Sequence, residues 1–382
     1  MSADANARVR AVIEDQVNAG REIGVQVAAY LDGKLAVDTW AGMADPDTGR
    51  PVDGETLFDV YSVTKAVTLT ALHLQVGRGL LEYDAPVVHY WPEYGARGKE
   101  ATTVRDVITH RSGVPQMPEG VTPEKICDWE WMVAEIAKLK PIALPGSRAL
   151  YQSLTFGWLA GELIRRSDPH HRLPGAFVRD ELAAPLGITD LWIGLPDEAA
   201  PRRAKPFNMV PEAPPEVQPA LALAATPIAV SLKPEVYGRP DVRRAGNAAV
   251  GGIFNARSCA RLFAMLAQGG ALDGVRLLPE DLVRTFNTPR SFSEERDEVM
   301  YGTAIPLSIA GYWLGGDQPP VCSAKSPRAI CHPGMGNSIA WADFDTKLAV
   351  SICHNRMFQP MTRAEDSILP IADAVRSALN LD

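Results

Sequence analysis

The sequence predicts an α+β fold in which one antiparallel sheet is built from both ends of the chain and a mainly helical lobe is inserted between them. Two strand-like runs, 24–31 and 34–40, flank an Asp-Gly pair, a strong signal for a β-hairpin. A similar pair of runs lies near the other end, at 338–344 and 347–353. The stretch between the two pairs, about 62–265, is typical of helices and loops.

Helices are expected to flank the sheet at both ends of the chain. Apolar residues recur at helical spacing over 9–17, and a last helix is expected at about 362–379. These expectations divide the chain into a discontinuous sheet unit, 1–61 and 266–382, and a mainly helical unit, 62–265.

Within the helical unit, prolines and small residues crowd the segment 201–240. Proline lacks a backbone N–H and clashes with the preceding helical turn, so regular helix is disfavoured there and a surface excursion is expected. A loop of this length either covers a binding cleft as a lid or has no role, and the sequence leaves both interpretations open.

Charge and hydropathy exclude two classes of partner. The 382 residues carry a formal net charge of -8, and an acidic surface repels the phosphate backbone of nucleic acid. No run approaches the ~20 apolar residues that a membrane span needs, and no basic-then-apolar leader follows Met1. We therefore expect a cytoplasmic protein that acts on a small molecule, with its oligomeric state left open.

The cysteines and histidines indicate no bound metal. The five cysteines are odd in number and include no C-x-x-C pair, which favours reduced thiols over a disulfide framework. The seven histidines show no metal-ligand spacing such as H-E-x-x-H. We therefore expect neither a catalytic metal nor a cofactor.

The first chemical motif is Ser62-x-x-Lys65, at the start of a strongly apolar helix. Three residues apart on a helix, the two side chains share a face. A serine hydroxyl becomes a nucleophile when a base removes its proton, and lysine serves as that base only if burial or a nearby cation lowers its pKa. The alternative is a helix-capping serine beside a solvated lysine, which a helix apolar on nearly every side does not favour.

Two further motifs carry chemistry. In Tyr151-Gln152-Ser153, a phenolate favoured by the Lys65 ammonium would take and return a proton; the alternative is a structural tyrosine at a loop-to-helix junction. In the segment 332–335, Gly334 permits close backbone approach. If this segment lines a cleft, the Met335 N–H joins the Ser62 N–H as an oxyanion hole. The alternative there is a glycine-bearing turn between strands.

In this order, the three motifs resemble those of the serine β-lactamase and penicillin-binding protein superfamily: S-x-x-K, then Y-x-N or S-x-N, then K-T-G or H-x-G. The stretches 57–61, 107–115 and 301–302 look like this family too, and the resemblance spans about residues 8–380. Within the family, the chain resembles most the family VIII carboxylesterases and their acyltransferase relatives. No G-x-S-x-G occurs, so the nucleophile elbow of the α/β-hydrolases is absent.

The resemblance implies a β-lactamase-like fold and a role for each matched residue. It implies that Ser62 is the acylated nucleophile, that Lys65 and Tyr151 are the base and acid pair, and that the Ser62 and Met335 N–H groups form the oxyanion hole. It also implies a set of substrate-binding residues, namely Ser153, His332 and Gly334.

Two departures from the usual motifs point toward neutral esters. Ser153 stands where the family usually has asparagine, and offers a shorter hydrogen-bonding arm to an amide substrate. His332 stands where many members have lysine, which removes a permanent charge that would bind a substrate carboxylate.

We therefore expect a serine esterase that acts on short- to medium-chain acyl esters through an acyl-enzyme. Three alternatives stay open: β-lactamase or D-alanyl-D-alanine peptidase activity, acyl transfer to an acceptor other than water, and a non-enzymatic penicillin-binding-like sensor or scaffold. The intact Ser62, Lys65 and Tyr151 argue against the last of these.

Overall fold

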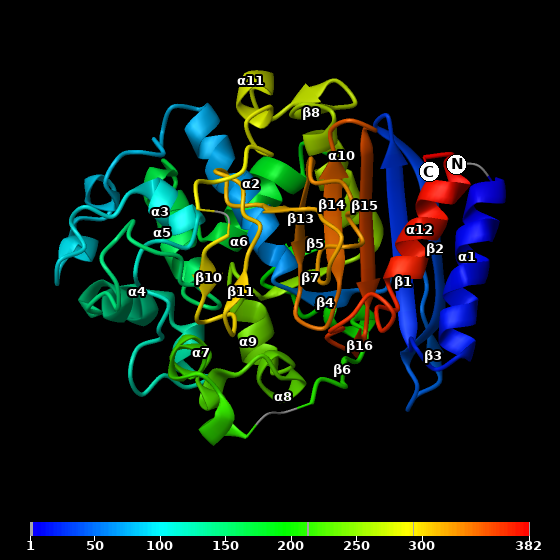
Figure 1. Cartoon of the computed structure of the whole chain (residues 1–382), viewed down its shortest axis with the longest axis horizontal. Coiled ribbons are helices and arrows are strands. Elements are labelled where there is room, and N and C mark those ends of the chain that lie inside the picture. The colour runs from blue at the N-terminus through cyan, green and yellow to red at the C-terminus, as the bar shows by residue number, and fades with distance from the viewer. Residues whose placement is uncertain (1–2, 212–213, 293, 382) are drawn as a thin grey trace.

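A central antiparallel sheet joins the two ends of the chain (Figure 1). The computed structural model describes residues 3–211, 214–292 and 294–381. Residues 212–213 of the proline-rich segment and residues 1–2, 293 and 382 of the expected sheet unit lie outside the described residues. The strands of the sheet, in spatial order, are β12 (Trp313–Leu314), β13 (Ala329–Pro333), β14 (Ile339–Asp343), β15 (Leu348–His354), β1 (Gly24–Leu31), β2 (Lys34–Asp45) and β3 (Arg50–Pro51).

Shorter strands and the helices make up the rest of the regular structure. One small sheet has the order β4 (Phe58–Tyr61), β7 (Gly252–Phe254) and β5 (Leu191–Ile193). Three strand pairs are β6 (Phe207–Asn208) with β16 (Arg356–Met357), β8 (Ala271–Leu272) with β9 (Val275–Arg276), and β10 (Arg296–Asp297) with β11 (Thr303–Ala304). The helices are α1 (Ala3–Asn18), α2 (Val63–Gly77), α3 (Val104–Ile108), α4 (Trp129–Lys138), α5 (Phe156–Ser167), α6 (Pro174–Val178), α7 (Ala220–Ala225), α8 (Pro234–Tyr237), α9 (Pro240–Ala245), α10 (Ala256–Ala267), α11 (Glu280–Val283) and α12 (Leu369–Ala378).

Helices cover both faces of the central sheet, which explains why its inner strands are apolar nearly throughout. Successive side chains of a strand point to opposite faces. In β1, Val25, Val27 and Ala29 belong to the apolar cluster that includes α1 and α12, whereas Ala28 and Tyr30 belong to the cluster that includes α10. The predicted α+β architecture, with a sheet assembled from both ends of the chain, is confirmed.

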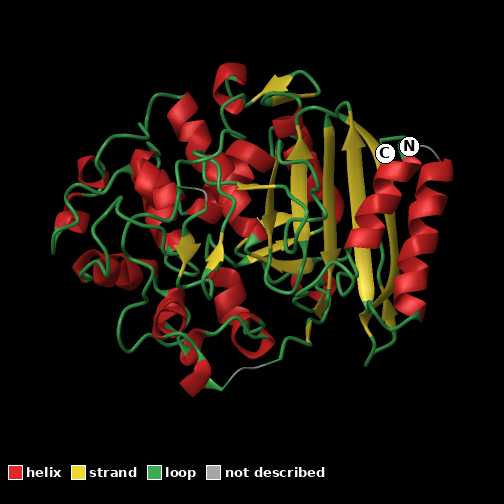
Figure 2. Cartoon of the chain, in the orientation of Figure 1, coloured by secondary structure: helices red, strands yellow, loops and turns green. Residues whose placement is uncertain are grey.

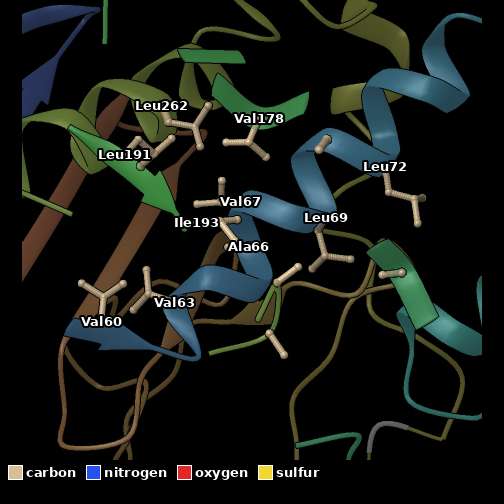
Figure 3. Packing of buried hydrophobic residues seen from close by; sticks show 14 of the residues in the cluster. Val60, Val63, Ala66, Val67, Leu69, Leu72, Val178, Leu191, Ile193 and Leu262 are labelled. Atoms are coloured by element: carbon tan, nitrogen blue, oxygen red, sulfur yellow. The ribbon is translucent and has the colours of Figure 1, made fainter. Parts of the chain in front are cut away.

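The helical lobe lies beside the sheet, at the left of Figure 2, and is organised around α2. Figure 3 shows apolar side chains of α2 facing Leu191 and Ile193 of β5, Val178 of α6 and Leu262 of α10. Every residue of α2 from Val63 to Gln75 is buried. A polar side chain on this helix is therefore buried whichever way it points.

The expected unit boundaries do not follow the packing. The boundary at 265/266 falls inside α10, which packs on β15 and β1 of the central sheet. The boundary at 61/62 leaves β4 with the sheet unit, but β4 pairs with β7, which in turn pairs with β5. We therefore propose that the chain re-enters the sheet unit at the start of α10.

Two expectations about helices need correction. The last helix begins at Leu369 rather than near 362, because the Asp366 carboxylate accepts the N–H groups of Ile368 and Leu369 at 3.0 and 3.3 Å and fixes the helix start. The proline-rich segment 201–240 contains the short helices α7 and α8 and leads into α9. α8 and α9 begin with a proline, a position where the missing N–H costs nothing.

Candidate active site

Ser62 lies at the junction of β4 and α2, where the backbone is strained. The preceding residue, Tyr61, has a φ of 44°, a conformation that costs a non-glycine residue about 1–3 kcal/mol. The Thr64 hydroxyl fixes this turn, since it donates to the Tyr61 carbonyl and accepts the Gly252 N–H of β7 at 2.8 Å. Ser62 is the N-cap residue of α2, yet its hydroxyl makes no capping hydrogen bond. That hydroxyl is therefore available for chemistry.

Lys65 is 0% exposed and lies against Ser62. Its Nζ is 3.1 Å from Ser62 Oγ, 2.9 Å from the Ser153 carbonyl oxygen and 3.3 Å from that of Ala249. Burial lowers the pKa of Lys65 well below its usual value, which favours a neutral amine with two N–H groups and one lone pair. Because the two carbonyls can only accept, the lone pair is left for the Ser62 O–H.

Tyr151 completes the central group, as a phenol. Its side chain lies near that of Ser62, and Lys65 Nζ lies 5.0 Å from the centre of its ring. Burial raises the pKa of Tyr151, and the nearby Ser62 side chain only partly opposes this effect. Desolvation therefore favours the protonated phenol over the expected phenolate.

Tyr151 is held in place by two residues that the motifs did not predict. The His110 ring lies 4.5 Å from the Tyr151 ring, and its Nδ1 accepts the N–H of Gln152 at 3.1 Å. The Asp297 carboxylate lies near the Tyr151 backbone N–H, and burial raises the pKa of Asp297 to about 6. His110 belongs to the family-like stretch 107–115, whereas no sequence signal marks Asp297.

The turn after β13 lies against the strand that leads into Ser62. A Cβ at Gly334 would lie 2.2 Å from the Val60 carbonyl oxygen, so only glycine fits there. Among the hydrogen bonds of the described residues, none uses the N–H of Ser62 or of Met335. Both N–H groups are therefore available to a substrate oxygen, as an oxyanion hole requires.

His332 is buried beneath the site surface rather than exposed in it. Its Nδ1 is 2.7 Å from the Pro333 carbonyl oxygen, and its ring lies 5.5 Å from the Trp313 ring. Burial lowers the pKa of His332 to about 3, and the charge of Lys65 adds to this effect. His332 is therefore neutral, as expected from the residue type in the third motif, so it offers no charge to a substrate.

Trp313 is a further site residue that the sequence did not reveal. It pairs through β12 with Cys331 of β13, and its ring meets the Tyr151 ring edge-on at 6.2 Å. Trp313 therefore bridges Tyr151 and His332. Ser153 contacts Lys65 through its backbone carbonyl, a contact that any residue type could supply.

The described part of the chain offers no grouping of three or more His, Cys, Asp or Glu side chains that could hold a metal ion. Within those same residues, no helix combines the length and the apolar character needed to cross a membrane.

The sequence of this chain is similar to those of known proteins. The family model described as Beta-lactamase matches residues 9–373. The chain is 32% identical over 355 residues to the protein named esterase/beta-lactamase LipL of Mycobacterium tuberculosis, covering 90% of this chain and 79% of the relative.

Solved structures are similar over nearly the whole chain. A family VIII carboxylesterase superposes with a TM-score of 0.88 at 26% identity, covering 98% of this chain and 97% of the other. A penicillin-binding protein homologue from Caulobacter crescentus superposes with a TM-score of 0.84 at 30% identity, covering 98% of each chain.

Proposed function

Since the chain belongs to the Beta-lactamase family and is a serine hydrolase, we propose that it hydrolyses short- to medium-chain acyl esters through an acyl-enzyme on Ser62. The family membership confirms the resemblance inferred from the motifs. Similarity to proteins named as an esterase and a carboxylesterase supports ester hydrolysis in general.

One observation carries the proposed mechanism: Lys65 is buried with two carbonyl acceptors and one hydroxyl. As a neutral amine, Lys65 accepts the Ser62 proton. As an ammonium, it has three N–H donors for the same three oxygens. The site thus accommodates both protonation states of Lys65 without moving a residue, which is what a base that cycles between them needs.

In the acylation step, Ser62 Oγ attacks the ester carbonyl carbon while its proton passes to Lys65 Nζ. The negative charge that develops on the carbonyl oxygen is stabilised by the N–H groups of Ser62 and Met335 and by the N-terminus of α2. When the tetrahedral intermediate collapses, the ester C–O bond breaks and the alcohol leaves with a proton from Tyr151. The Lys65 ammonium then returns a proton to Tyr151.

In the deacylation step, water attacks the acyl-enzyme carbonyl. The Tyr151 and Lys65 pair accepts the water proton, the Ser62 ester bond breaks and Ser62 regains its proton. The carboxylic acid is then released. Acyl transfer would follow the same steps with an alcohol in place of water, so product analysis with an added alcohol distinguishes the two reactions.

The surroundings of the site favour neutral esters over substrates that carry a carboxylate. His332 stands in the third motif where a lysine would supply a permanent charge, and burial keeps His332 neutral. β-Lactams and peptidoglycan peptides carry a carboxylate that such a lysine would bind. We therefore propose ester hydrolysis as the main activity, with β-lactam hydrolysis weaker.

The test is hydrolysis of p-nitrophenyl acetate, butyrate and octanoate beside nitrocefin, with wild type and Ser62→Ala. We expect ester turnover that is lost in the variant, and little cleavage of nitrocefin. Dominant nitrocefin turnover would make the protein a β-lactamase instead. An Ser62→Ala variant that keeps even about a tenth of the wild-type rate would refute the proposed nucleophile.

A further inference from the structure

A buried polar network adjoins the turn 334–337, and the mechanism above makes no use of it. Each of its members is at most 4% exposed. They are Glu22, Cys322, Asn337, Ser338, His354, Asp366 and Ser367. Buried polar groups cost folding free energy unless they are hydrogen-bonded, so a buried hydrogen-bonded network beside a proposed active site calls for a reason.

The first arm of the network anchors the turn itself. Asn337 has a φ of 84°, and its N–H donates to the Gly334 carbonyl at 3.0 Å. Its side-chain Nδ2 donates to Asp366 Oδ1 at 2.8 Å. Asp366 is in turn fixed by the Cys322 thiol, 3.2 Å from Oδ2, and by the N–H of Ile368 at the start of α12.

The second arm holds the next residue of the same turn. Ser338 Oγ accepts the His354 N–H at 3.4 Å, and His354 Nδ1 is 2.7 Å from Glu22 Oε2. The Ser367 hydroxyl donates to Glu22 Oε1 at 2.5 Å. Asp366 and Ser367 are adjacent, so both arms tie the turn to the segment that leads into α12.

We propose that Asn337 and Asp366 are positioning residues for the oxyanion hole. Their hydrogen bond holds the turn after β13 so that the Met335 N–H faces the oxygen of the substrate carbonyl. The physical reason is that a preorganised N–H stabilises developing charge only at the right place, and a displacement of about 1 Å can cost on the order of 10²-fold in rate. This inference rests on the proposed ester hydrolysis at Ser62.

Two variants break the hydrogen bond between Asn337 and Asp366, one by changing the donor and the other by changing the acceptor. Asn337→Gly removes the side-chain anchor and keeps the left-handed backbone, which glycine adopts without strain. Asp366→Ser keeps an oxygen that can cap α12 but is too short to reach Asn337. For either variant, we expect kcat with p-nitrophenyl acetate to fall roughly tenfold or more, while KM changes by less than about twofold.

A second readout separates positioning from a general structural effect. A boronic acid forms a tetrahedral adduct on a serine whose oxygen occupies the oxyanion hole, so its affinity should weaken by about the same factor as kcat. The double variant should be little worse than Asn337→Gly alone, because both changes break one bond. Asn380→Gly, at another left-handed asparagine with a φ of 58°, is the matched control and should keep wild-type kinetics.

The inference is overturned if both folded variants keep wild-type kcat and boronic acid affinity, or if their losses simply add. Thermal melting establishes that each variant is folded, and either variant alone decides if the other fails to fold. Failure of the underlying proposal looks different. In that case, the wild type would not hydrolyse the ester, or Ser62→Ala would hydrolyse it equally well.

Discussion

Two buried lysines of the helical lobe have nearly the same surroundings, but only one of them is proposed to act as a base. Lys65 and Lys99 are both 0% exposed. Lys99 Nζ donates to the carbonyls of Ala96, Ala137 and Leu139 at 2.6, 2.9 and 2.5 Å. Burial lowers the pKa of Lys99 to about 8, so this lysine is still an ammonium at neutral pH.

The difference lies in the third partner. All three oxygens around Lys99 can only accept a hydrogen bond, so they hold three N–H donors and favour the ammonium. One of the three oxygens around Lys65 is the Ser62 hydroxyl, which can give up a proton. Burial alone therefore does not make a lysine a base. A partner that can donate its proton is what distinguishes the proposed catalytic lysine from a structural one.

The sharpest test of this comparison replaces each lysine by methionine, which keeps the length and apolar stem. Lys65→Met should lower kcat/KM for p-nitrophenyl esters by about 10²–10⁴-fold, because the Ser62 proton loses its acceptor. Lys99→Met should keep kcat/KM but melt several degrees lower, since three buried carbonyls each lose a donor at a cost of about 1–3 kcal/mol. Steady-state kinetics and thermal melting measure both. Equal kinetic losses in the two variants would remove the distinction.

Tyr151→Phe should have the next largest effect. It removes the proton donor for the leaving alcohol and keeps the ring that packs against His110 and Trp313. We expect kcat to fall by about 10²-fold. The loss should be smaller for p-nitrophenyl esters than for alkyl esters, because p-nitrophenolate leaves readily without a proton. A uniform loss across leaving groups would argue for a structural role.

The pH dependence of wild-type kcat/KM follows from the lowered pKa of Lys65. Protonated Lys65 has no lone pair for the Ser62 proton, so activity should rise with pH as Lys65 deprotonates and then level off. The raised pKa of Tyr151 keeps the phenol protonated, so the plateau should continue into mildly alkaline pH. A fall in activity between about pH 7 and 9 would contradict the assignment of Tyr151 as the proton donor, since even free tyrosine titrates only near pH 10.

His332→Gln should have the smallest effect. Because the pKa of His332 is lowered to about 3, this side chain is neutral over the pH range of the assay. It therefore cannot cause the loss of activity at low pH, the acid limb of the pH–rate profile, which is assigned to Lys65. We expect kcat/KM to change by less than about tenfold, below the usual effect of a proton-transfer group. The acid limb should keep its position in a pH–rate profile. A displaced limb would assign the titration to His332 rather than Lys65.

Much of the fold could be predicted from the sequence, because its signals are local. The Asp-Gly hairpin and the apolar strands near the C-terminus were predicted and are observed as β1, β2, β14 and β15. Boundaries set by side-chain contacts were not predictable. The start of α12 depends on the Asp366 carboxylate. α8 and α9 begin with a proline, a residue that disfavours helix except in the first turn.

Part of the candidate site could likewise be predicted from the sequence, and part of it could not. Spacing placed Ser62 beside Lys65, since three helical residues bring two side chains together. Distant segments also contribute to the site, through the Ala249 carbonyl, Asp297 and Trp313. Such contacts leave no pattern in a single sequence. The protonation state of Tyr151 depends on burial, which the motif does not reveal.

In the proposed mechanism, the Ser62 oxygen is the nucleophile and neutral Lys65 activates it. The most direct measurement is labelling with a fluorophosphonate, followed by intact-mass and peptide mass spectrometry on wild type, Ser62→Ala and Lys65→Met. We expect one adduct on Ser62, no adduct in Ser62→Ala and much slower labelling of Lys65→Met. An adduct on another residue, or wild-type labelling of Lys65→Met, would contradict it.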